Sequence, residues 1–69
     1  MTAVTVLIYE GGARTPVLAH TAYGRTRDAA VAILRVHAKY DRFLRAALTT
    51  RRFRGIPLRV VVRGPRPRR

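Results

Sequence analysis

Hydrophobic positions in the middle of the chain recur with the period of a helix. Between Thr26 and Leu48 they follow one another at intervals of three or four residues, at Ala29, Ile33, Val36, Tyr40, Leu44 and Ala47. This spacing keeps them on one side of a helix with about 3.6 residues per turn. Thr26 is a good N-cap, and Asp28 in the first turn complements the helix dipole. The pattern therefore predicts one amphipathic helix over about residues 26–48.

Three other segments have the alternation of strands. Residues 3–9 are rich in β-branched side chains and apolar on both faces, which predicts a strand in the centre of a sheet. Residues 16–23 have mixed faces and begin at Pro16, which suits an edge strand. Residues 56–63 alternate cleanly, so that Leu58, Val60 and Val62 share a packed face. The opposite face of this strand, with Arg59 and Arg63, meets solvent or a ligand.

The order strand, strand, helix, strand indicates an α+β fold with two layers. Gly11 and Gly12 allow a tight turn, which makes the first two strands an antiparallel hairpin. Pairing of the third strand with the first gives the order 2-1-3, in which every neighbouring pair is antiparallel. We therefore predict a single β-β-α-β domain over residues 1–63, with a three-stranded sheet packed on one helix. A flexible basic tail at residues 64–69 is expected to follow, because it is rich in Pro and Arg.

The sheet face away from the helix is expected to expose Leu7, Tyr9 and Val61. Two open sheet edges would also attract pairing. A homodimer, formed by sheet extension or by packing of these faces, resolves both problems. Leu7, Tyr9 and Val61 are therefore the predicted protein interface.

The net positive charge of the chain predicts a polyanionic partner. The chain has 69 residues with 15 basic and 3 acidic side chains, a formal net charge of +12. Codon usage in a GC-rich genome explains why Lys39 is the single lysine, but it does not explain why acids are so few. A surface of this kind attracts polyanions, and Arg binds phosphate through two hydrogen bonds at once.

Candidate phosphate contacts lie on the helix, in the loop at 49–55, on the third strand and in the tail. They are Arg35, Arg42, Arg45, Arg51, Arg52, Arg54, Arg59, Arg63, Arg66, Arg68 and Arg69. Phe53 stands among the loop arginines, where it either stacks on a base or turns inward to close the core. We predict a small basic protein that binds the nucleic-acid backbone, DNA or RNA. The alternative is a protein-binding module, such as a phage-type inhibitor that docks on an acidic protein surface.

Other classes of function lack the residues that they need. The chain has no cysteine, and His20, His37 and three scattered acids assemble neither a metal site nor an acid–base pair. We therefore expect no enzyme, no cofactor, no metal and no small-molecule substrate. Neither a secretion signal nor an apolar run of the ~20 residues that span a bilayer is visible. A cytoplasmic protein without a membrane partner is expected.

The junction before the predicted helix resembles a known motif. The run Tyr23-Gly24-Arg25-Thr26-Arg27-Asp28-Ala29 is similar to the G-x-T-x-x-E-A junction of HicB-type antitoxin domains. The sheet-then-helix order is also similar to that of the arm-binding domains of phage integrases. Both families place three strands before the helix, whereas one of the strands predicted here follows it. No functional residue is therefore carried over from either family.

Overall fold

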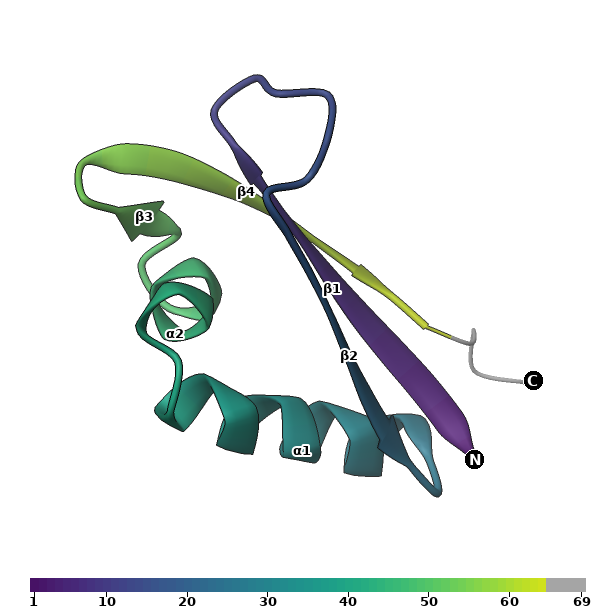
Figure 1. The fold of residues 1–69 in the computed structure, drawn as a ribbon. Coiled ribbons are helices and arrows are strands. Elements are labelled where there is room, and N and C mark those ends of the chain that lie inside the picture. The colour runs from purple at the N-terminus through teal and green to yellow at the C-terminus, as the bar shows by residue number, and fades with distance from the viewer. Residues whose placement is uncertain (65–69) are drawn as a thin grey trace.

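The computed structural model describes residues 1–64 as a curled four-stranded sheet with two helices on one of its faces (Figure 1). The elements are β1 (Thr2–Glu10), β2 (Leu18–Gly24), α1 (Arg27–Lys39), α2 (Arg42–Leu48), β3 (Arg52–Phe53) and β4 (Ile56–Arg63). The sheet is antiparallel with the order β2-β1-β4-β3. The α+β class is confirmed, with one helix and one strand more than predicted.

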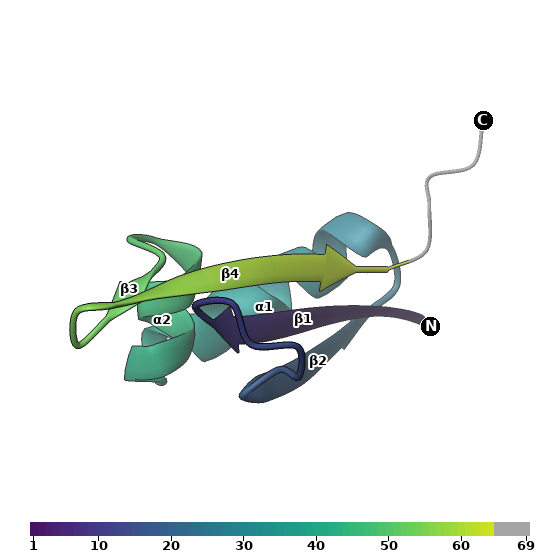
Figure 2. The same cartoon turned by 90° about the horizontal axis from the view of Figure 1, so that it is seen from above.

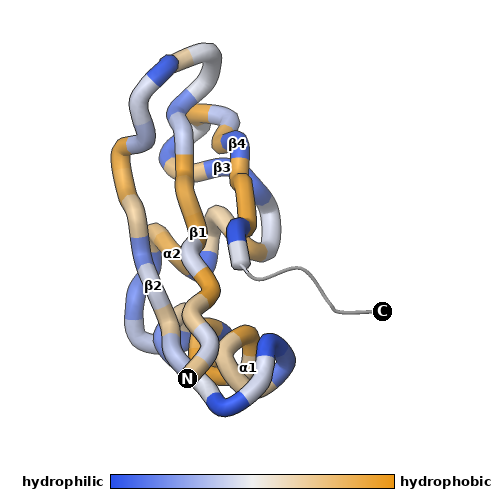
Figure 3. The backbone as a smooth tube through the Cα atoms, turned by 90° about the vertical axis from the view of Figure 1, so that its right-hand side faces the viewer, coloured by the Kyte–Doolittle hydropathy of each residue, from blue (hydrophilic) through white to orange (hydrophobic). Residues whose placement is uncertain are grey.

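The strand β1 lies in the centre, between β2 and β4 (Figure 2). In the two ladders Val6 lies opposite His20 of β2 and opposite Val62 of β4. Hydrophobic positions run along β1 and β4 (Figure 3), and β1 buries Val4, Val6 and Ile8 completely. The predicted order of the three long strands is therefore confirmed, because a strand that is apolar on both faces takes the central place.

The connection between β1 and β2 is longer than predicted. Its first turn is closed by a hydrogen bond from the amide of Ala13 to the carbonyl of Glu10, 3.0 Å long. The amide of Val17 donates to the carbonyl of Ile8 at 2.8 Å, and β2 starts only at Leu18. The prediction that the second strand begins at Pro16 is wrong by two residues, because proline has no amide to donate to the ladder.

The segment predicted as a loop at residues 49–55 contains a short strand. Arg52 and Phe53 form β3, which pairs with Pro57 and Ile56 of β4. The two residues between these strands, Arg54 and Gly55, have φ values of 51° and 80°. Two positive φ values in a two-residue connection are the requirement of a type I′ hairpin turn. The prediction of three strands missed this hairpin.

The single helix predicted over 26–48 is two helices. The amide of Tyr40 donates to the carbonyl of His37 at 3.1 Å, which ends α1. Asp41 then begins α2 as its N-cap, since its Oδ1 accepts from the amide of Leu44 at 3.0 Å. The predicted N-cap of the first helix, Thr26, is confirmed, because its hydroxyl accepts from the amide of Ala29 at 3.1 Å.

The predicted apolar stripe is wrong in α1. The buried residues of α1 are Ala30, Leu34 and Ala38, each one or two positions away from the predicted stripe. The predicted stripe residues Ile33, Val36 and Tyr40 have exposed fractions of 38%, 49% and 88%. Small alanines face the sheet because α1 packs closely over β2, where Ala22 and Gly24 are also small and buried.

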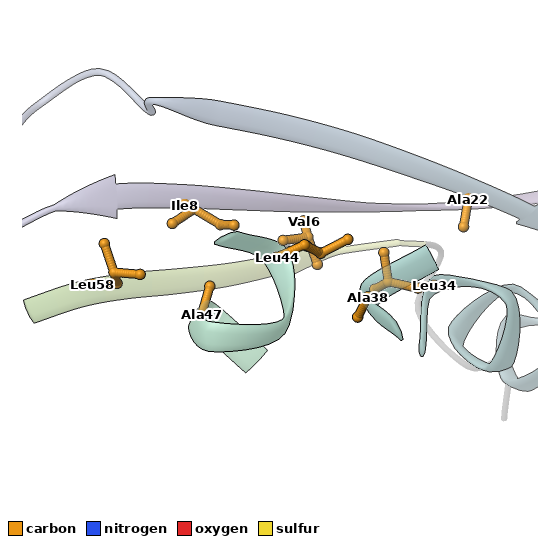
Figure 4. Packing of buried hydrophobic residues seen from close by; sticks show 8 residues of the cluster. All are labelled: Val6, Ile8, Ala22, Leu34, Ala38, Leu44, Ala47 and Leu58. Atoms are coloured by element: carbon orange, nitrogen blue, oxygen red, sulfur yellow. The ribbon is translucent and has the colours of Figure 1, made fainter. Parts of the chain in front are cut away.

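The core lies between the sheet and the helices (Figure 4). Its buried members are Val6, Ile8, Ala22, Leu34, Ala38, Leu44, Ala47 and Leu58. Leu34 of α1 lies toward Ala22, whereas Ala47 of α2 lies toward Leu58. Because both helices cover the same face, no helix among residues 1–64 covers the opposite face of the sheet.

Candidate functional site

The sheet face opposite the helices is covered by no described part of the chain. Since Val4, Val6 and Ile8 point to the helices, the alternating residues of each strand point the other way. These residues are Ala3, Thr5, Leu7, Tyr9, Ala19, Thr21, Tyr23, Pro57, Arg59, Val61 and Arg63, with Arg52 of β3 opposite Pro57. We call this surface the open face.

One end of the open face carries a cation–π pair. Tyr9 and Arg59 are opposite each other in the β1–β4 ladder, and Cζ of Arg59 lies 4.3 Å from the ring centroid of Tyr9. Such pairs contribute ~0.5–1 kcal/mol at exposed sites. Tyr9 is half-buried while Arg59 is exposed, so the ring supports the guanidinium from below. The outer side of Arg59 remains available to a ligand.

The other end of the open face carries Tyr23, whose exposed fraction is 56%. Tyr23 lies opposite Ala3, six residues along β1 from Tyr9, so the two tyrosines are about 20 Å apart along the strand. Between them, the hydroxyl oxygens of Thr5 and Thr21 are hydrogen-bonded at 2.9 Å. The open face therefore presents aromatic side chains at both ends and hydroxyls in the middle.

The three acids of the chain lie away from the open face. Glu10 pairs with Leu58, which belongs to the core, so the Glu10 side chain is on the helix side. Asp28 is in the first turn of α1, and Asp41 caps α2. The charged side chains on the open face are consequently those of Arg59 and Arg63 and, at its outer edge, Arg52 of β3, which lies opposite Pro57; all three are exposed.

A second group of arginines surrounds the β3–β4 hairpin. Arg51, Arg52 and Arg54 are all exposed there. Phe53 points inward, where its ring contacts Phe43 edge-on at a centroid distance of 5.1 Å and an interplanar angle of 82°. Of the two predicted roles of Phe53, the structure thus supports the one that closes the core. Cζ of Arg54 lies 5.3 Å from the centroid of the same ring.

A third group of cations lines a groove on the helix side. Arg35 and Lys39 of α1 and Arg45 of α2 lie around an apolar groove of about 440 Å³ between the two helices and β4. Arg42 is exposed on α2 but does not line the groove. The groove is roomy enough for several side chains of a ligand.

All eight described members of the predicted phosphate-binding set are exposed. The structure divides them among the open face, the hairpin and the helices, and it does not gather them into one patch. Arg66, Arg68 and Arg69 lie outside the described residues. The predicted protein interface, Leu7, Tyr9 and Val61, does lie on the open face, but all three side chains are half-buried and not fully exposed as expected.

Two histidines that are far apart in the sequence, His20 and His37, are in contact. Nε2 of His20 on β2 and Nδ1 of His37 on α1 are 2.8 Å apart, and the rings contact edge-on with centroids 4.9 Å apart. One ring donates and the other accepts, so this pair joins sheet to helix. Within residues 1–64, no three His, Asp or Glu side chains are grouped in a way that would hold a metal ion.

Neither α1 nor α2, the helices of the described chain, has the length and apolar character needed to cross a membrane. Comparison of the sequence and structure with family models, curated proteins and solved structures found no match.

Sequence reasoning missed two residues of these surfaces. Tyr23 shares the open face with Tyr9 because the hairpin register places Val6 opposite His20. That register depends on the long β1–β2 connection, which the sequence pattern does not reveal. Lys39 follows Arg35 at the helical interval of four, so the sequence does place the two cations on one side of α1.

Proposed function

We propose that the protein binds single-stranded nucleic acid on the open face of its sheet. In this proposal Arg59 and Arg63 contact phosphates. Tyr23 stacks on one base, and another base stacks on the guanidinium that Tyr9 supports. Aromatic rings and arginine planes on an exposed sheet are the usual means of holding unpaired bases.

One observation carries the proposal. The only sheet face that the described chain leaves uncovered combines two tyrosines with three arginines and no carboxylate. An uncovered sheet face in a two-layer fold exposes hydrophobic surface unless a ligand or a partner covers it. Positive charge next to aromatic rings favours a ligand with both phosphates and flat bases.

The remaining exposed arginines have a supporting role in this proposal. With a formal net charge of +12, the protein attracts any nucleic acid from a distance, independently of sequence. The arginines of the helices and the hairpin therefore raise affinity in general, whereas the open face determines the preference for single strands.

The test compares matched pairs of variants by fluorescence anisotropy of a labelled single strand of about 12 nucleotides, a length within known site sizes. The double variant Arg59→Ala/Arg63→Ala is expected to bind at least tenfold more weakly. Its salt slope should be less steep by about 1.4, since each phosphate contact on a single strand contributes about 0.7. Tyr23→Ala should lose about 1–3 kcal/mol of binding free energy through lost stacking.

The control variants have the same types of substitution, two Arg→Ala changes or one Tyr→Ala change, but in the helix layer. Arg35→Ala/Arg42→Ala removes the same charge from the helices, and Tyr40→Ala removes a tyrosine that is 88% exposed at the end of α1. Both should weaken binding less than their open-face counterparts do. Equal losses for both sets would contradict a site on the open face and leave only unspecific attraction.

The predicted homodimer remains a prediction. Packing of two open faces would cover Leu7, Val61 and the tyrosines, and it would compete with nucleic acid for the same surface. It would also bring Arg59 and Arg63 of both copies together, which opposes it at low salt. Sedimentation at increasing protein concentration, with and without the single strand, measures this competition.

A further inference from the structure

The groove on the helix side has an apolar floor and a basic rim. Leu34 of α1, Leu48 of α2 and Val62 of β4 contribute to the floor, while Arg35, Lys39 and Arg45 line it as well. Val62 is 46% exposed although it lies on the core side of the sheet, opposite the buried Val6. Neither helix therefore covers this end of β4.

The same end of β4 is an open sheet edge. The short strand β3 pairs only with Ile56 and Pro57. The amide of Leu58 donates to the carbonyl of Arg51 at 2.8 Å, so the backbone groups of Leu58 point away from β1. Because these directions alternate along a strand, the backbone groups of Val60 and Val62 also point to the outer edge. No strand among residues 1–64 pairs with them.

An added strand would use the edge and the groove together. Hydrogen bonds to Val60 and Val62 would extend the sheet by one strand beyond β4. Every second side chain of that strand would then point to the helix side, where the groove lies. The intervening side chains would point to the side of the open face.

The basic side chains around this edge determine what kind of strand can pair with β4. A second copy of β4 would place Arg59 and Arg63 against their own counterparts, and like charges opposite each other destabilise a strand pair. Arg35, Lys39 and Arg45 instead complement carboxylates. We propose that the outer edge of β4 and the adjoining groove bind an extended, acidic segment of another protein, with apolar residues at alternate positions.

In the test, the full chain is used to select binders from a random library of displayed peptides, and the affinity of each selected peptide is then measured. We expect the selected peptides to alternate apolar residues with positions rich in Asp or Glu. Val62→Pro removes an outward amide without disturbing the ladder to β1, and should weaken these peptides at least tenfold. Arg45→Glu should do the same, whereas Arg42→Glu, on the same helix but outside the groove, should change affinity less than twofold. Circular dichroism verifies that each variant is folded.

Several outcomes would overturn the proposal. One is a library that yields no binder, and another is a set of binders unaffected by both Val62→Pro and Arg45→Glu. Self-association that Val62→Pro abolishes would assign the edge to a second copy. The site differs from the open face, so Tyr23→Ala should leave peptide affinity unchanged, and the failure of one proposal is distinguishable from that of the other.

Discussion

Gly24 lies at the point where the end of β2 meets the first turn of α1. A Cβ atom at this position would be 2.5 Å from the amide nitrogen of Ala30 and 2.8 Å from the carbonyl carbon of Ala29. Both contacts are with helix backbone, which cannot move aside as the end of a side chain can. The close approach explains why α1 presents small residues to the sheet and why the larger Ile33 and Val36 point outward.

Gly24→Ala is therefore expected to lower the free energy of unfolding by about 1–3 kcal/mol, the usual range for overpacking. Gly12→Ala is the matched control, because a Cβ there has no atom within 4 Å and its φ is not positive. Urea unfolding followed by circular dichroism measures both variants. Equal stability of the two would mean that α1 and β2 are not in close contact.

Arg51 has a backbone conformation that is unfavourable for an arginine. Its φ is 57°, in the left-handed region that disfavours most residues other than Gly, Asn and Asp. Its amide donates to the carbonyl of Ala46 and its carbonyl accepts from Leu58, both at 2.8 Å, so two elements hold it in place. An arginine kept in such a position is consistent with a role for its charge.

Arg51→Asn is expected to raise the free energy of unfolding by up to about 1 kcal/mol, because Asn tolerates positive φ. The same change at the neighbouring Arg52, which lies in β3, should bring no gain. Thermal unfolding compares the two. A gain at Arg52 that equals the gain at Arg51 would attribute the effect to reduced charge repulsion and not to the backbone.

At the scale of elements, the break between α1 and α2 has a cause that can be read along the chain. The buried series Ala30, Leu34 and Ala38, continued at helical spacing, would next bring Arg42 or Asp41 to the core. Ending α1 at Tyr40 and starting again at Asp41 turns Leu44 and Ala47 to the sheet instead. The stripe through Tyr40 predicts one continuous helix instead, and periodicity alone does not indicate which of the two stripes is buried.

Asp41 is consequently the N-cap of α2 and not a residue within one continuous helix. Asp41→Ala should lower the free energy of unfolding by about 1 kcal/mol, whereas Asp41→Asn keeps an acceptor and should change it little. Denaturant unfolding of both variants tests this. No difference between the variants would exclude an N-cap at this position and would favour the continuous helix.

The short hairpin of β3 and β4 shows a second limit of pattern reading. A two-residue strand is too short to display alternation, and the turn residues Arg54 and Gly55 are not among the usual Asn-Gly or Asp-Gly pairs. Phe53 is held by Phe43, which is ten residues away in sequence. Only tertiary contacts of this kind make such a hairpin, and the sequence pattern does not contain them.

At the scale of the molecule, the arrangement of the long strands could be predicted because it depends on composition. The apolar faces of β1 require a central place, and the alternation along β4 separates Val60 from Arg59 and Val61. The candidate site could be predicted only in part. Arg59 and Arg63 were expected on the outer face, but the place of Tyr23 follows from a register that the loop length sets.

Binding of single strands to the open face can be observed by NMR, in spectra of the labelled protein titrated with a short single-stranded oligonucleotide near physiological salt. We expect shifts of the Tyr9 and Tyr23 ring signals, the Arg59 and Arg63 side-chain signals, and backbone amides of β1, β2 and β4. Shifts confined to α1, α2 and the turn at Arg54 and Gly55, or no shifts at all, would contradict it.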